Sequence, residues 1–226
     1  MQTGLMATEC IIPAYSVLTD DQIRKINSAC VPVKHRKGEL LFGQDRPVSH
    51  LLYVKSGLIK IHRESTNNKT VIVKIVGPDR YLGLLSIFYD LKYQISATVI
   101  EESELVYINI QALKDLISEN GQYGLKILEQ SSKEGVYLLN KLSVFHQKQV
   151  PGRMAELLLS FSTEVYNNNE FTLPLSRQEL ADYVYSTKES VSRTLTEFKN
   201  DRMIDIEDRK VILKSIDLLK ILSKLG

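Results

Sequence analysis

The sequence predicts an α+β protein in which a β-rich N-terminal part, one long helix and a small helical C-terminal part follow one another. Between residues 31 and 110, short runs rich in β-branched and aromatic residues alternate with turn formers. From residue 111 onward the apolar residues recur at helical spacing. Two helix starts ten residues apart, followed by a hairpin pattern, come near the C-terminus. We therefore expect three parts, at residues 1–120, 121–150 and 151–226.

The β-rich part contains five strand-like runs, at residues 51–54, 58–62, 70–76, 96–100 and 105–108. The turn formers between them are Lys55-Ser56-Gly57, Asn67-Asn68 and Gly77-Pro78-Asp79. Short strands at this spacing are typical of a β-sandwich or barrel. The apolar interior of such a fold is a natural place for a small ligand.

Composition excludes several classes of protein. No run approaches the ~20 apolar residues of a membrane span, and the first 13 residues have no basic residue, so we expect neither a membrane segment nor a signal peptide. The expected location is the cytoplasm. The two cysteines, Cys10 and Cys30, are too few for a disulfide framework or an iron–sulfur cluster. Because the net charge is only +2, a nucleic-acid function has to rest on a motif.

The long helix, predicted at residues 122–149, carries an apolar seam whose members are spaced alternately by three and four positions. Its members are Leu125, Leu128, Ser132, Gly135, Leu139, Leu142 and His146. The seam either packs on its own domain or pairs with the same helix of a second chain, and we favour the homodimer because an exposed seam needs cover. Val150-Pro151-Gly152 ends this helix and is the predicted hinge. A second helix is expected at residues 153–166, closed by an asparagine loop at 167–169.

The C-terminal part has the pattern of a helix-turn-helix. Two capping boxes, Ser176 with Glu179 and Ser186 with Glu189, predict two helix starts with a short helix and a tight turn between them. In the second helix one face is apolar, formed by Val191, Leu195 and Phe198. The opposite side carries the polar residues Lys188, Glu189, Ser192, Arg193 and Lys199.

Such a polar helix face can enter the major groove of double-stranded DNA. Arg binds guanine through two hydrogen bonds, Glu accepts from cytosine, and Ser can do either. The next segment, residues 203–213 with a turn at 207–209, predicts the hairpin of a winged helix. A last helix is expected at residues 216–225.

These motifs together resemble the CRP/FNR family of bacterial transcription regulators, over nearly the whole chain from residue 31. The recognition-helix pattern E-x-x-S-R corresponds to Glu189, Ser192 and Arg193. By resemblance these residues, with Lys188, contact bases in an inverted repeat of a TTGA-like half-site. Arg177, Gln178 and Thr187 are expected at phosphates, and RNA polymerase is the implied partner. The segments 37–42 and 52–61 resemble the family's cyclic-nucleotide-binding-like β-roll, a double-stranded β-helix.

Two turn positions depart from the family pattern. Tyr185 stands where the helix-turn-helix turn often has Gly, which predicts a slightly different turn because a left-handed non-Gly residue costs ~1–2 kcal/mol. In the β-roll, Asp45 occupies a position that is usually Gly, and Gly43 is displaced from it.

The effector site departs further. Members that bind cyclic AMP hold the ribose with Gly-Glu and the phosphate with Arg-Ser, and the matching pairs here are Gly83-Leu84 and Ile95-Ser96. A buried phosphate without a cationic partner is unfavourable, so cyclic AMP is not the expected effector. An apolar pocket is expected, lined by Tyr81, Leu82, Gly83, Leu84, Leu85, Phe88, Ile95 and Ser96. Haem, through His62 or His146, is an alternative ligand by resemblance.

Two other functions remain as alternatives. A cupin-type barrel enzyme clusters several histidines, but His35, His50, His62 and His146 form no His-x-His pair, and no catalytic elbow or P-loop is present, so no enzyme activity is expected. A cyclic-nucleotide-type module acting on a partner protein is disfavoured by the helix-turn-helix and by the missing phosphate arginine.

Overall fold

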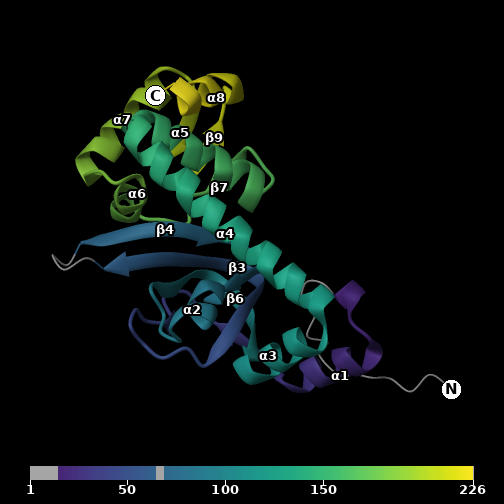
Figure 1. Ribbon diagram of the computed structural model, residues 1–226. Coiled ribbons are helices and arrows are strands. Elements are labelled where there is room, and N and C mark those ends of the chain that lie inside the picture. Colours follow the sequence, from purple (N-terminus) through teal and green to yellow (C-terminus); the bar gives the residue numbers. More distant parts are fainter. Residues whose placement is uncertain (1–14, 65–68, 226) are drawn as a thin grey trace. The chain divides into compact units, whose positions relative to one another are not determined.

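The computed structural model describes residues 15–64 and 69–225, apart from the side chains of residues 15, 143–146 and 225 (Figure 1). Cys10, the predicted turn Asn67-Asn68 and the His146 side chain lie outside this description. The chain forms two compact units, Met1–Arg63 with Ile75–Gly135 and Glu64–Lys74 with Val136–Gly226. The three-part division expected from the sequence stays a prediction.

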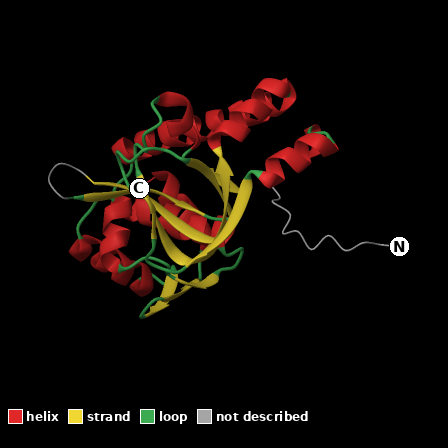
Figure 2. Ribbon diagram, turned by 90° about the horizontal axis from the view of Figure 1, so that it is seen from below, coloured by secondary structure: helices red, strands yellow, loops and turns green. Residues whose placement is uncertain are grey.

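The N-terminal unit contains most of an antiparallel sheet, with strand order β1-β6-β3-β4, in which β2 also pairs with β6 and β5 with β3. Most of β4 falls in the segment Glu64–Lys74, which is counted with the other unit. Figure 2 shows that these strands are strongly curved. The elements are η1 (Tyr15–Val17), α1 (Asp20–Ser28), β1 (Cys30–His35), β2 (Leu40–Phe42), β3 (His50–Glu64), β4 (Thr70–Val76), β5 (Arg80–Leu82), α2 (Leu84–Tyr89), β6 (Ser96–Asn109) and α3 (Ile110–Glu119). The predicted α+β class is confirmed.

The five predicted strand runs are present, but they merge into longer strands. Residues 51–54 and 58–62 both belong to β3, and 96–100 and 105–108 both belong to β6. The turn predicted at Lys55-Ser56-Gly57 is wrong, because β3 continues through it with shifts of register against β6. Gly57 has a φ of 90°, and a Cβ there would collide with Ser103 and the Glu102 carbonyl. This segment is therefore a bulge that lets two long strands bend together.

The hydrophobic core of this unit joins the sheet to its helices. Residues of α1, α2, α3 and α4 are buried against strand residues in one cluster. Its members are Ile26, Leu51, Tyr53, Leu84, Ile87, Val106, Ile108, Leu113, Leu116, Tyr123 and Ile127. Helices α1 and α2 were not predicted from the sequence.

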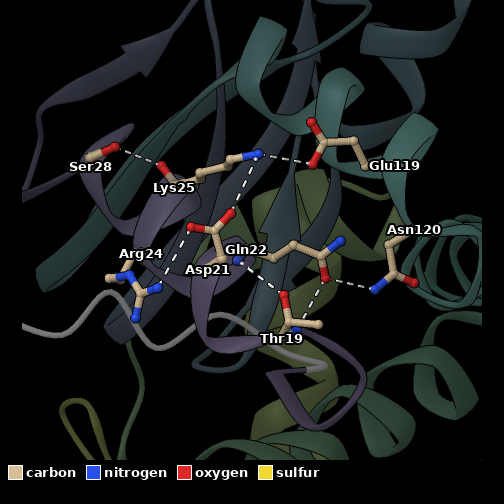
Figure 3. Close-up of polar contacts among 8 residues, drawn as sticks. All are labelled: Thr19, Asp21, Gln22, Arg24, Lys25, Ser28, Glu119 and Asn120. Atoms are coloured by element: carbon tan, nitrogen blue, oxygen red, sulfur yellow. Dashed lines mark hydrogen bonds and ion pairs between the residues drawn. The ribbon is translucent and has the colours of Figure 1, made fainter.

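Asn120 fixes the beginning of the long helix α4 (Gly121–Gln147), and Figure 3 shows its contact with Gln22 of α1. Its side-chain oxygen accepts the backbone N–H of Tyr123 (3.0 Å) in the first turn of α4. Its amide group donates to Val17 O (2.8 Å) and to Gln22 Oε1 (3.0 Å). One side chain thus caps α4 and attaches the N-terminal helix α1 to it.

The long helix ends two residues earlier than predicted, and the next helix begins three residues earlier than predicted. A hinge at Val150-Pro151-Gly152 stays a prediction. Helix α4 stops at Gln147, Lys148 and Gln149 are not helical, and α5 (Val150–Ser160) begins before Pro151. Pro151 and Gly152 therefore lie in the first turn of α5, where proline is well tolerated. The Arg153 guanidinium donates to the Lys148 carbonyl (2.7 Å) across the break.

The C-terminal unit surrounds a three-stranded sheet with order β7-β9-β8. Its further elements are η2 (Phe161–Val165), β7 (Glu170–Thr172), α6 (Arg177–Val184), α7 (Lys188–Asn200), β8 (Ile204–Glu207), β9 (Lys210–Leu213) and α8 (Ile216–Leu225). The hairpin β8–β9 and the last helix are confirmed, whereas β7 was not predicted. None of the described helices is long and apolar enough to cross a membrane.

Candidate nucleic-acid interface

The first helix of the predicted helix-turn-helix starts as the sequence indicates. The Ser176 hydroxyl accepts the backbone N–H of Glu179 (3.2 Å), and the Glu179 carboxylate accepts the backbone N–H of Ser176 (2.8 Å). This reciprocal capping box satisfies two backbone donors that a helix start leaves without partners. The capping fixes where α6 begins.

The turn and the start of the second helix differ by one residue from the prediction. Tyr185 adopts the left-handed conformation (φ 53°, ψ 55°) at the C-cap of α6, so a non-Gly residue takes the conformation usual for Gly. The N-cap of α7 is Thr187, whose hydroxyl accepts the Ser190 N–H (3.2 Å). The capping box predicted for Ser186 with Glu189 is therefore wrong, because Ser186 lies in the turn.

The polar face of α7 is exposed in its first two turns. Lys188, Glu189, Ser192 and Arg193 are all exposed, as predicted for base-contacting residues. On the opposite face Val191, Leu195 and Phe198 are at most 2% exposed. The helix therefore lies with its apolar side in the core and presents its N-terminal polar residues to solvent. The positive end of the helix dipole lies at the same end, which favours a polyanionic ligand.

Arg177, predicted at a DNA phosphate, connects α6 to the tip of the hairpin. It donates a hydrogen bond to the Asp208 carbonyl (3.2 Å) and is partly buried. Burial lowers the pKa of its guanidinium, and nearby Asp208 opposes that effect. Gln178 is exposed and donates to Asp182 (2.9 Å).

Two further cationic side chains hold the hairpin in place through hydrogen bonds, and the sequence analysis did not predict these bonds. Lys199 of α7 donates to the Ile206 carbonyl (2.9 Å) on β8. Arg209 donates to the Leu173 carbonyl through Nε (3.1 Å) and Nη2 (2.7 Å). Both acceptors are backbone carbonyls, which no side-chain pattern reveals. The wing is therefore attached to both helices of the motif and to the segment before α6.

The seam of α4 is exposed along both halves of the helix. Leu125 (59%), Leu128 (61%), Leu139 (64%) and Leu142 (60%) each expose more than half of their surface. Ser132 is exposed, and a Cβ on Gly135 would meet no atom within 4 Å. Four large apolar side chains on one helix are thus open to solvent in the single chain.

In the segment that matches the effector site, the side chains pack against or bond to other residues of the same chain. Leu84 is 6% exposed and belongs to the hydrophobic core. Tyr93 stacks on Phe42 with ring centroids 3.8 Å apart, and the Cε1 atom of its ring lies 2.9 Å from the position that a Cβ on Gly83 would take. Ser96 is buried, and its hydroxyl accepts the Gln44 N–H (2.9 Å).

The predicted lining of that pocket is only partly enclosed. Leu82 is buried, and Tyr81, Gly83 and Ile95 are partly buried. Leu85 (41%) and Phe88 (51%) are exposed on α2, because this short helix turns Leu84 and Ile87 into the core instead. That Leu85 and Phe88 line an apolar pocket stays a prediction.

The candidate haem ligand His62 is engaged within the sheet. It is 8% exposed, and its Nε2 lies 2.9 Å from the Thr98 hydroxyl on β6. Iron ligation through this atom would break that bond. Among the described residues no group of three His, Cys, Asp or Glu side chains could hold a metal ion.

A helix-turn-helix with an attached wing and an exposed polar recognition helix defines a DNA-binding protein. Two family models match the chain, a cyclic nucleotide-binding domain at residues 32–120 and a Crp-like helix-turn-helix domain at residues 152–222. The chain belongs to the CRP/FNR family of transcription regulators, which are not enzymes.

Curated relatives and solved structures agree with this family. The chain is 28% identical over 192 residues to a CRP-like cAMP-activated global transcriptional regulator of Mycobacterium tuberculosis, covering 83% of this chain and 86% of the relative. It is 26% identical to the transcriptional activator protein anr of Pseudomonas aeruginosa, covering 94% and 88%. The fold matches FixK2 from Bradyrhizobium japonicum with a TM-score of 0.79 at 20% identity, covering 85% and 96%.

Proposed function

We propose that this protein is a homodimeric regulator that recognises an inverted repeat of a TTGA-like half-site. The observation that carries the proposal is the exposed N-terminal face of α7, with Lys188, Glu189, Ser192 and Arg193. These side chains are long or polar enough to reach base edges in the major groove. Arg177, Gln178 and Thr187, at the start of α6 and the N-cap of α7, are placed for phosphate contacts in this proposal.

The proposed homodimer is supported by the exposed apolar seam of α4. The exposed leucines of its seam need cover, and the symmetric partner of a helix with a self-complementary seam is a second copy. Two copies would carry two recognition helices, which an inverted repeat matches when its half-sites lie about one DNA turn apart, ~34 Å. RNA polymerase is the partner implied by the family.

The effector is proposed not to be cyclic AMP, although the Mycobacterium tuberculosis relative is described as cAMP-activated. Leu84, at the position of the ribose-binding carboxylate, is a core residue, and Ile95 supplies no charge for a phosphate. Ser96 is already bonded to the Gln44 backbone. A cyclic nucleotide would lose hydration without gaining these partners. Calorimetric titration with cyclic AMP checks this: saturable micromolar binding that tightens the DNA complex would refute it.

Haem is the second proposal for the effector, and binding through His62 Nε2 would require that atom to give up its contact with Thr98. The absorption spectrum of freshly purified protein tests it directly. A haem band that persists in His62→Ala would exclude His62 as the ligand, and absence of any band would remove the haem proposal.

The DNA proposal is tested by a gel-shift assay on an inverted TTGA-type repeat, with a scrambled repeat of equal length as control. Preferential binding of the repeat supports recognition through α7. Equal binding of both DNAs would leave only electrostatic association. The variant Glu197→Gln is a matched control, because Glu197 is exposed farther along α7 and is not among the proposed contacts.

A further inference from the structure

Lys148, in the two-residue break between α4 and α5, is bound at both its side chain and its backbone by residues of α5. Its ammonium group donates a hydrogen bond to the Glu156 carboxylate (2.7 Å), and its backbone carbonyl accepts one from the Arg153 guanidinium (2.7 Å). We call these two contacts the Lys148 bridge. The Lys148 side chain is 17% exposed and that of Glu156 47%, so the ion pair is partly shielded from water. All three residues belong to the same compact unit.

The backbone at this junction is held less firmly than a continuous helix. Lys148 and Gln149 are not helical, and Gln149 is extended (φ −77°, ψ 171°). Gln149 is the N-cap of α5, but its side chain makes no capping bond. The Arg153 N–H donates to the Gln149 carbonyl (3.1 Å), which begins α5 without reaching back to Lys148. The Lys148 bridge joins α5 to the residue that directly follows α4.

Helix α5 shares its core with the helix that carries the proposed base contacts. It packs against α6, α7 and α8, and buries Met154, Leu157 and Leu158. Because such interiors are closely packed, helices in one core keep their relative directions. The direction that α5 takes from the end of α4 therefore also sets the direction of α7.

Arg153 adds a link to the turn before α7. Burial raises the pKa of the Tyr185 phenol in that turn, and the nearby Arg153 guanidinium opposes the rise. The guanidinium that binds the Lys148 carbonyl therefore also lies close to the helix-turn-helix turn. The junction and the turn are connected through one side chain.

We propose that the Lys148 bridge sets the half-site spacing that this protein accepts, with Lys148 as a positioning residue. The inference rests on the proposed homodimer, in which two paired α4 helices each carry one recognition helix. One added base pair moves a half-site by ~3.4 Å and rotates it by ~35° about the DNA axis. A junction that can bend accommodates several spacings, whereas a fixed junction selects one.

The test is fluorescence anisotropy on inverted repeats whose spacer grows in steps of one base pair, with a single half-site for comparison, at constant ionic strength. The wild type is expected to prefer one spacing. In Lys148→Met the preference for that spacing over its two neighbours is expected to shrink about 5-fold, the effect of losing one partly exposed ion pair. Affinity for the single half-site is expected to stay unchanged, because α7 itself is not altered.

Further variants separate the ion pair from the bulk of its side chains. Lys148→Arg keeps the charge and is expected to keep the wild-type spacing preference. Glu156→Gln is expected to act as Lys148→Met does, and the double variant is expected to add nothing, because all three remove the same pair. Glu156 also lies near the charge of Lys141, so Lys148→Met is the cleaner single variant.

Lys133→Met is the matched control. Lys133 is an exposed lysine whose partner, Glu129, lies on the same helix α4. Its ion pair has the same chemistry but does not cross the break between α4 and α5. This variant is therefore expected to keep the wild-type spacing preference.

The outcomes distinguish this inference from the proposed function. An unchanged spacing preference in Lys148→Met overturns the inference, and so does a wild type that binds all spacings equally. Equal weakening at every spacing and at the half-site overturns it too, with a salt slope shallower by about 1 if Lys148 contacts a phosphate and a lower melting temperature if it only stabilises the fold. If Lys148→Met does not fold, Glu156→Gln decides by the same criteria. A wild type that binds no repeat at any spacing overturns the proposed function, and this inference with it.

Discussion

The Arg177 guanidinium on α6 donates a hydrogen bond of 3.2 Å to the backbone carbonyl of Asp208 at the tip of the β8–β9 hairpin. This bond connects two parts of the DNA-binding unit that are 31 residues apart in the sequence. The same side chain is proposed to contact a phosphate, so in this proposal Arg177 would both hold the hairpin and bind DNA.

Replacing Arg177 by Ala is expected to weaken binding to cognate and scrambled DNA alike. The reason is that a phosphate contact carries no sequence information. The slope of log affinity against log salt is expected to become shallower by about 1. Anisotropy titrations at three salt concentrations measure both effects, and a loss confined to cognate DNA would contradict the phosphate assignment.

Arg193→Ala is expected to act differently. Loss of a base contact is predicted to cost ~1–3 kcal/mol at one base-pair position and to relax the preference there. Competition assays with half-sites substituted at each position measure this. Arg193 would not be a base-contacting residue if cognate and scrambled DNA lost affinity equally.

The double variant Leu139→Asp, Leu142→Asp is expected to be monomeric. Both leucines are exposed in the single chain, and two carboxylates on each side of a seam would repel across it. Light scattering measures the mass. Asn140→Asp is the control, since Asn140 is an exposed neighbour off the seam and the change adds one carboxylate to the same helix. A dimeric double variant would show that the seam is assigned wrongly.

Alanine substitutions at two glycines are expected to lower the free energy of unfolding by different amounts, because only one of the two positions is also crowded. Gly38 (φ 91°) and Gly57 (φ 90°) share a conformation, but a Cβ meets nothing within 4 Å at Gly38 and collides with β6 at Gly57. Gly38→Ala is expected to cost ~1–2 kcal/mol. Gly57→Ala is expected to cost more, since strands must also move. Urea unfolding measures both, and equal losses would contradict the bulge.

Lys141 of α4, whose ammonium lies 3.7 Å from the centroid of the Tyr183 ring, predicts a pH dependence of stability. Its pKa is about 7 in the folded protein, lowered by burial, against an ordinary value of 10.5. Between these pH values the unfolded chain holds more protons, so the free energy of unfolding is expected to rise with pH from about 7 upward. Below pH 7 the cost of the buried charge is fully present. Urea unfolding at several pH values is expected to show a smaller rise in Lys141→Met, and an unchanged rise would contradict the assignment.

The sequence predicts this fold best where the signal is local. The capping box of Ser176 and Glu179 uses only neighbouring atoms and is confirmed. The box at Ser186 fails because Thr187 caps equally well, and the left-handed Tyr185 moves the helix start by one residue. At Asp45 the chain again takes a positive φ (63°) with a residue other than Gly.

The structural predictions fail where contacts between segments distant in the sequence determine the local structure. Lys55-Ser56-Gly57 has the composition of a turn, but pairing with β6 keeps β3 continuous through it. The boundary between the two helices lies at Lys148 and Gln149, before Val150, although Pro151 takes its place in a first helical turn as expected. None of these follows from spacing along the chain.

The central claim, that α7 recognises an inverted repeat as part of a dimer, is tested most directly by selecting binding sites from random DNA with the purified protein. The account predicts enrichment of two TTGA-like half-sites in inverted orientation, with centres ~10–10.5 base pairs or a multiple of that apart. The same selection with Arg193→Ala is predicted to lose the preference at one position of each half-site. Enrichment of a single asymmetric motif, or of none, by the wild-type protein would contradict the account.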